Sequence, residues 1–115
     1  MSDMKQQQSQ REELFADFAH AVNIPAGQLE RWLDTERSRN VGRHKGQRES
    51  HSHAAGRRIL RLLRTPRADF TADDLVHMRK VVHHVERQLR HRPRGDVSNT
   101  DWRFALMNWG HDPLR

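Results

Sequence analysis

The chain has 115 residues, 34% of them hydrophobic and 31% charged, which is enough for one domain with a single modest core and too little for several. It contains no cysteine, and this excludes disulfide bonds and thiolate chemistry. The formal net charge of +6 favours polyanionic partners, above all nucleic acid.

The first eight residues are polar, and we expect them to form a disordered tail ahead of a single helical domain over residues 9–115. Ser9 and Glu12 have the spacing of a capping box, which predicts that the first helix begins there. The apolar residues that follow share one helical face as far as Val22, and Pro25 suits the first turn of a second helix. The apolar side of that second helix consists of Leu29, Trp32 and Leu33.

Residues 37–53 show no helical periodicity, and their two glycines and many polar groups predict a flexible basic loop. The helical pattern of a third helix begins near residues 50–54 and continues to about Arg64, where Thr65 and Pro66 stop it. The glycines of the loop permit its backbone to approach a partner closely.

A fourth helix is predicted from Thr71 to about His91, with Asp74 completing a capping box. Its apolar spacing is the most regular in the chain and is carried by Leu75, Met78, Val82, Val85 and Leu89. Another capping box, from Ser98 to Asp101, opens a short last helix. Because no segment alternates like a strand, we expect an all-α fold, a compact bundle of about five helices with the basic flexible loop between the second and third.

The positive charge is concentrated in the middle of the chain. Residues 37–67 carry ten Lys or Arg and a single acid, Glu49, whereas residues 1–36 carry three Lys or Arg against seven acids. Residues 68–115 are close to neutral, with eight bases and seven acids. The middle segment therefore supplies the whole excess, and such concentration indicates a binding surface more strongly than the total does.

The third predicted helix combines an arginine-rich arc with an apolar arc. At about 100° per residue its four arginines share one side, while Ile59, Leu60, Leu62 and Leu63 occupy the other and can pack on the core. Guanidinium groups are well shaped for phosphate oxygens and for guanine edges, and the basic loop lies directly ahead. The sequence thus predicts a DNA-binding protein with low sequence specificity. Its predicted contact residues are Arg43, Lys45, Arg48, Arg57, Arg58, Arg61, Arg64, Arg79 and Lys80.

Other interpretations of the basic segment stay open. The arginines could form a merely solvated surface, bind RNA, or be neutralised by the chain's own acidic N-terminal third. The main alternative function is a protein–protein interaction module whose basic face docks on an acidic partner. No membrane is expected as a partner, since the apolar arc has no Trp or Phe to anchor in headgroups and no stretch approaches ~18 apolar residues. The oligomeric state is not indicated by the sequence.

We expect no enzymatic activity, no metal and no cofactor. His77, His84 and His91 lie seven residues apart on one helix side, so adjacent members are ~10 Å apart and too distant to share an ion. No G-x-S-x-G nucleophile motif or glycine-rich phosphate loop occurs. The start of the chain has no apolar segment of a secretory signal, so we expect a soluble cytoplasmic protein, associated with the nucleoid if bacterial.

A specific string, Met-Asn-Trp-Gly-His-Asp-Pro, occupies residues 107–113, and further characteristic runs lie at residues 29–33, 77–82 and 92–97. On these runs nearly the whole chain resembles a small bacterial family of unknown function that is also found in fungi. Some relatives carry a DNA-binding label, so the resemblance implies a DNA partner. It supplies no functional residues that could be assigned here.

Overall fold

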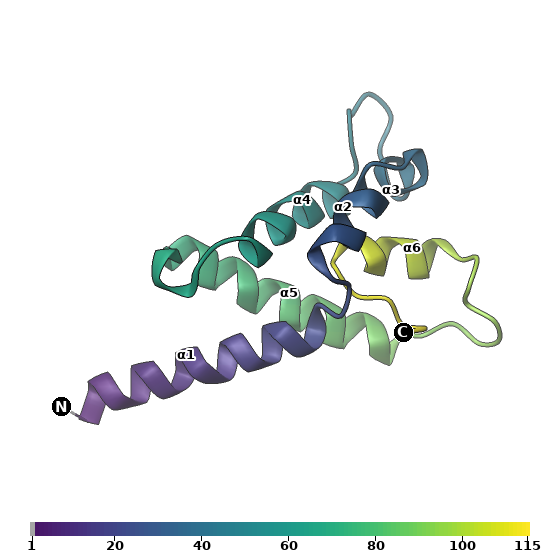
Figure 1. The fold of residues 1–115 in the computed structure, drawn as a ribbon. Helices are drawn as coiled ribbons and strands as arrows, with labels where there is room; N and C mark the ends of the chain where they lie inside the picture. The colour runs from purple at the N-terminus through teal and green to yellow at the C-terminus, as the bar shows by residue number, and fades with distance from the viewer. Residues whose placement is uncertain (1) are drawn as a thin grey trace.

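The computed structural model describes residues 2–115, which form six α-helices, one short 3₁₀ turn and no strand. The elements are α1 (Ser2–Ala21), α2 (Ala26–Leu33), α3 (Glu36–Asn40), α4 (His51–Leu63), η1 (Arg67–Asp69), α5 (Ala72–Arg90) and α6 (Asp101–Asn108). The long helices α1 and α5 pack against each other, while α2, α3 and α6 gather around the first half of α4 (Figure 1). This arrangement confirms the predicted all-α bundle.

The hydrophobic core lies where the apolar faces of five helices meet. It is contributed by Leu14, Phe18, Ala21 and Val22 of α1 and its end, Leu29 and Leu33 of α2, Ala55, Ile59 and Leu62 of α4, Leu75, Met78, Val81, Val82 and Val85 of α5, and Leu106 and Trp109 at α6. The regular spacing on α5 therefore does mark a buried face, except at Leu89, whose side chain is 38% exposed.

The predicted start of the first helix at Ser9 is wrong. α1 begins at Ser2, so residues 2–8, expected to form a disordered tail, are helical, and Met1 of that expected tail lies outside the described residues. Lys, Gln and Met are good helix formers, which allows the helix to extend beyond its packed part. From residue 3 on its side chains stay exposed until Leu14 reaches the core.

The helix α3 lies inside the segment that was expected to be a loop. Its N-cap is Thr35, whose hydroxyl accepts a hydrogen bond from the backbone N–H of Ser38 at 3.2 Å. A helix of five residues is too short to show an apolar period, which explains why the sequence pattern does not reveal it. Residues 41–50 of the expected loop connect α3 to α4 without a helix, whereas residues 51–53, also expected in the loop, form the first turn of α4.

The helix starts distinguish true capping boxes from accidental matches. At α5 the prediction is confirmed, because Thr71 accepts from the N–H of Asp74 at 3.1 Å and Asp74 accepts from the N–H of Thr71 at 3.0 Å. At α6 the predicted cap, Ser98, is wrong. The hydroxyl of Thr100 caps that helix by accepting from the N–H of Arg103 at 3.2 Å.

Candidate functional site

Most of the arginines predicted to bind DNA on α4 are paired with acidic groups of the same chain. Arg57 donates from Nε to Oε2 of Glu49 at 3.0 Å, and its Nη2 donates to Oε1 of the same carboxylate. Arg64 at the end of α4 pairs with Glu30 of α2. These contacts are formed across 8 and 34 residues of sequence. They neutralise part of the charge that the sequence analysis assigned to a partner.

Arg58 extends from α4 to the start of α5. Its Nη2 lies 3.7 Å from Oδ1 of Asp74 and donates to the carbonyl oxygen of Asp73 at 3.2 Å. Within the described chain, Arg61 is the member of the predicted set on α4 that has no carboxylate at ion-pair distance. The four arginines thus point toward different neighbours and do not form one uncommitted face.

The acids in these pairs stay ionised well below neutral pH. The hydrogen bond from Arg57 is the main cause that lowers the pKa of Glu49 to about 2, and a hydrogen bond with His53 acts in the same direction. A hydrogen bond from Arg64 lowers the pKa of Glu30. Both carboxylates therefore carry a full negative charge beside their arginines at pH 7.

The other predicted residues lie on separate surfaces. Arg43, Lys45 and Arg48 are exposed on the loop between α3 and α4 and form no ion pair with any described residue. Arg79 and Lys80 are neighbours in sequence but line different hollows: Arg79 lies beside α1, and Lys80 lies in a cleft facing α4 and α6. The structure therefore brings Lys80, but not Arg79, together with Val41 and Gly42 at the start of the loop between α3 and α4.

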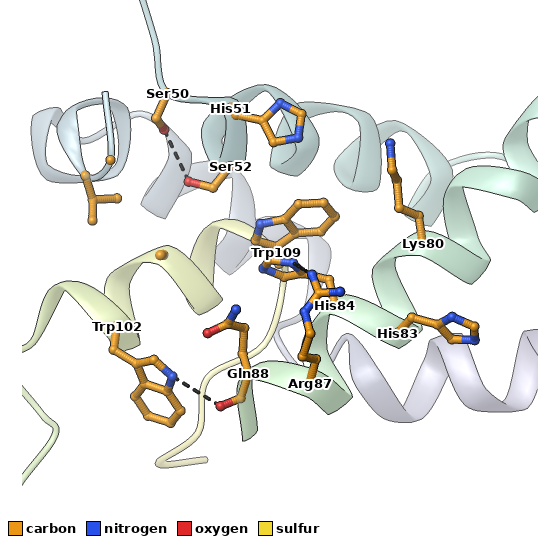
Figure 2. Close-up of a pocket in the computed structure, with 13 residues that line it drawn as sticks. Ser50, His51, Ser52, Lys80, His83, His84, Arg87, Gln88, Trp102 and Trp109 are labelled. Carbon is orange, nitrogen blue, oxygen red and sulfur yellow. Dashed lines mark hydrogen bonds between the residues drawn. The ribbon is translucent and has the colours of Figure 1, made fainter. Parts of the chain in front are cut away.

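This cleft is the most prominent concave surface of the described chain. It has a volume of about 680 Å³ and lies between the start of α4, the exposed side of α5 and α6, with Val41 and Gly42 of the basic loop at its edge. Five basic or titratable side chains line it, and no Asp or Glu does (Figure 2). These five are His51 of α4 and Lys80, His83, His84 and Arg87 of α5. We call this surface the basic cleft.

Aromatic side chains form the apolar part of the basic cleft. Trp109 is buried, with 4% of its surface exposed, and His84 stacks on it with ring centroids 4.1 Å apart. Trp102 is half-buried, and its indole Nε1 donates to the carbonyl oxygen of Gln88 at 3.2 Å (Figure 2). The hydrogen bond fixes the ring of Trp102 at the side of the cleft. The site therefore combines cations with flat apolar surface.

The permanent charges of the basic cleft are those of Lys80 and Arg87. Burial, together with the nearby charges of Arg87 and His51, lowers the pKa of His84 to about 4. His84 is consequently neutral at pH 7, and its Nδ1 accepts a hydrogen bond from Nη2 of Arg87 at 3.3 Å. An anion in the cleft would thus meet two fixed cations and a neutral imidazole.

The first turn of α4 adds backbone donors to the same wall. The hydroxyl of Ser50 caps α4 by accepting from the N–H of His53 at 3.1 Å. The backbone N–H groups of His51 and Ser52 form no hydrogen bond with the described residues. A helix start with such groups has a positive electrostatic potential, which is consistent with the basic character of the cleft.

A buried asparagine holds the walls of the basic cleft together. Asn108 of α6 is fully buried, and its Oδ1 accepts from Nε1 of Trp32 at 2.8 Å and from the hydroxyl of Ser38 at 2.5 Å. Its Nδ2 donates to the carbonyl of Ser38 at 2.8 Å and to the hydroxyl of Ser52 at 2.9 Å. One side chain thereby joins α2, α3, α4 and α6, and it fixes Ser52 at the cleft wall.

The end of the chain forms a second set of structural contacts. Asp112 receives two hydrogen bonds from the guanidinium of Arg103, at 2.9 and 3.1 Å, and exchanges two with the side chain of Asn23, at 2.7 and 2.9 Å. Nδ1 of His111 lies 2.7 Å from the carbonyl oxygen of Ala21. These contacts attach the C-terminal string to the junction of α1 and α2, so much of that string serves the fold.

The sequence did not single out His83 or Arg87; it favoured solvated or hydrogen-bonded histidines at His51 and His84, and packing of Trp102 over stacking on bases. A signal was available, because Lys80, His83, His84 and Arg87 have the 3-4-7 spacing of one helical face. Of the predicted histidine row, His77 and His84 both face Trp109.

In the described part of the chain no three His, Asp or Glu residues gather as metal ligands, and no helix is long and apolar enough to cross a bilayer.

Comparison with known proteins gives one match. The model of a family described as "Protein of unknown function (DUF3140)" matches residues 17–107, which is most of the chain. No curated protein and no solved structure matches the chain. The matched segment includes the basic loop, the residues of the basic cleft up to Ala105, and the arginines of α4.

Proposed function

The chain belongs to this family of unknown function, and we propose that it binds DNA with little sequence preference, through contacts of DNA phosphates with the basic cleft and the loop beside it. The proposal keeps the DNA partner that the sequence indicates. It places the main contact at Lys80, Arg87 and the loop cations. Arg57, Arg58 and Arg64 are assigned to ion pairs within the chain.

The observation that carries the proposal is the absence of carboxylates from the lining of the basic cleft. An arginine that already pairs with Glu49 or Glu30 must give up that pair before it can bind a phosphate, which offsets part of the gain, and the pairs are exposed enough for this part to be small. Lys80 has no ion pair to lose among the described residues, and the same holds for Arg43 and Lys45 on the loop. These groups can release condensed counterions from DNA at little internal cost.

Low sequence specificity follows from the type of contact. Phosphate contacts fix the position of a protein on the duplex and carry no direct sequence information. The helix α5 carries Lys80 and Arg87 on its exposed side and packs on the core through Val81 and Val85, so it does not project as a free recognition helix. We therefore expect random-sequence duplexes to bind as well as any chosen site.

The test is fluorescence anisotropy of a labelled random-sequence duplex of about 30 base pairs, titrated at several salt concentrations. Double substitution Lys80→Gln with Arg87→Gln should weaken binding and reduce the slope of log K against log salt by about 0.9 for each phosphate that the variant no longer neutralises. Arg79→Gln removes the charge of the residue that precedes Lys80 in the sequence, but Arg79 lies on the side of α5 that faces α1, outside the basic cleft. This variant should bind within about twofold of the unchanged protein, whereas Lys80→Gln alone, which removes the same single charge from the basic cleft, should bind more weakly.

A second comparison separates the two surfaces. Substitution Arg57→Gln with Arg64→Gln should lower thermal stability and leave DNA affinity nearly unchanged, because both groups are paired internally. If that variant loses DNA binding while Lys80→Gln with Arg87→Gln retains it, the arginines of α4 are the contact surface and the assignment to the basic cleft is wrong. Absence of binding at low salt would overturn the DNA proposal and favour an acidic protein partner.

A further inference from the structure

We propose that the basic cleft accommodates one unpaired nucleotide, with its phosphate beside Arg87 and its base against Trp102. The inference rests on the proposed function and names the form of nucleic acid that the site selects. A protein built this way prefers single strands, strand ends or unpaired nucleotides over an intact duplex.

The basic cleft has room for more than a phosphate group. Tracking a duplex backbone requires only a charged surface, whereas the basic cleft is an open hollow of about 680 Å³. This volume falls within the roughly 300–1,000 Å³ range of pockets that hold small organic ligands. A whole nucleotide can therefore enter it.

The lining of the basic cleft is divided chemically. Lys80 and Arg87 are exposed and supply two positive charges, while Trp102 and Ala105 on α6 supply apolar surface. Trp102 lies beside Gln88, the sequence neighbour of Arg87, whereas Lys80 lies at the other end of the cleft (Figure 2). A nucleotide has the same division, with an anionic phosphate at one end and a flat base at the other. Bases stack on aromatic side chains when they are not stacked on each other.

The aromatic surface of the basic cleft is rigid. The indole of Trp102 is held by its hydrogen bond to the carbonyl of Gln88 and has the guanidinium of Arg92 over its ring at 5.9 Å from the centroid, and Trp109 stacks against His77 and His84 on α5. A ring that is already fixed loses little conformational entropy when a base stacks on it. Because bases inside a duplex are covered by their neighbours, only an unpaired base can reach this surface.

The experiment first uses the unchanged protein. Anisotropy titrations compare a labelled oligothymidine strand of about 30 nucleotides with the random-sequence duplex. Three unlabelled probes then compete with the strand: deoxythymidine 5′-monophosphate, thymidine and inorganic phosphate. We expect the strand to bind at least tenfold more tightly than the duplex. The monophosphate should compete and quench tryptophan fluorescence, whereas thymidine and inorganic phosphate should be at least tenfold weaker.

Two variants then test the cleft itself. Trp102→Leu removes the stacking ring and should weaken single-strand binding by about tenfold. Trp102→Phe keeps a ring and should stay within about threefold. Because Trp102 is half-buried, a second variant covers the case in which Trp102→Leu does not fold. Ala105→Met fills the cleft without changing a charge, and it should reduce single-strand binding while duplex binding persists.

The outcomes separate this inference from the proposed function. In one outcome, duplex binding is salt-sensitive and depends on Lys80 and Arg87, but the single strand is not preferred and the monophosphate does not compete. That outcome overturns the nucleotide inference and leaves the proposed function standing. Equal competition by inorganic phosphate also overturns the inference, since the base would then contribute nothing. Binding of the monophosphate in the absence of any DNA binding overturns the proposed function and supports the cleft as a nucleotide site.

Discussion

The substitution Asn108→Ala should be among the most damaging single changes in the chain. Asn108 is fully buried and forms four hydrogen bonds, with Trp32, with the hydroxyl and the carbonyl of Ser38, and with Ser52. Alanine has no group that can replace any of them. The truncated side chain also leaves a void that is enclosed by α2, α3 and α4.

The magnitude follows from the groups that lose their partners. Ser38 is fully buried, so its hydroxyl and its carbonyl are both deprived of a bond where water cannot readily replace it. Each buried polar group left unsatisfied costs about 1–3 kcal/mol. We expect a loss of about 3–5 kcal/mol, a large part of the roughly 5–15 kcal/mol that stabilises a typical domain.

Urea unfolding monitored by circular dichroism measures this loss. With a slope of about 1–3 kcal/mol per molar urea, the midpoint should fall by more than about 1 M. The matched control is Asn99→Ala, because Asn99 is exposed and accepts a single hydrogen bond, from Nη1 of Arg37 at 3.0 Å. Loss of the Asn99 side chain should change the free energy of unfolding by about 0.5 kcal/mol or less. A loss below about 1 kcal/mol for Asn108→Ala would refute the view that this network holds the four helices together.

Two further predictions concern packing and pH. Gly56→Ala should destabilise the protein by about 2 kcal/mol or more despite the better helix propensity of alanine, since the new Cβ would lie 2.3 Å from the carbonyl oxygen of Asn108. The control Gly27→Ala, whose Cβ would have its nearest neighbour at 3.7 Å, should be neutral or slightly stabilising in thermal melts. Similar melting temperatures for the two variants would contradict the packing argument. Burial lowers the pKa of His77 to about 4, so between pH 6.5 and 4 the unfolded chain takes up a proton that the folded chain does not. The free energy of unfolding should therefore fall as the pH is lowered across that window, by at most about 3 kcal/mol for this residue. In urea titrations His77→Gln should show a weaker dependence of the unfolding free energy on pH. An unchanged pH dependence in the variant would show that His77 is not its source.

Much of the helical framework could be predicted because its determinants are local. The capping box of Thr71 and Asp74 involves residues three apart, and the apolar spacing from Leu75 to Val85 lies on one helix. The same local logic failed at Ser9. A Ser and a Glu three residues apart also occur on the surface of a continuous helix, and the pattern cannot tell the two cases apart.

The role of the basic residues could not be predicted in the same way. The sequence shows how many arginines α4 carries, but Arg64 finds its acid on α2, and Arg58 finds Asp74 at the start of α5. Arg79 and Lys80 are equivalent as sequence neighbours, and only the packing of α5 against α1 and α6 directs them into different hollows.

The sequence by itself determined the class of fold, the concentration of positive charge and the faces that become buried, because composition and helical periodicity act within a few residues. The tertiary structure alone decided which charges are neutralised and where a cavity lies. The basic cleft is assembled from the loop before α4, from α5 and from α6, and Asn108 reaches Ser38 across 70 residues. Contacts at such separations depend on how the helices pack, and the local pattern of residues does not specify that packing.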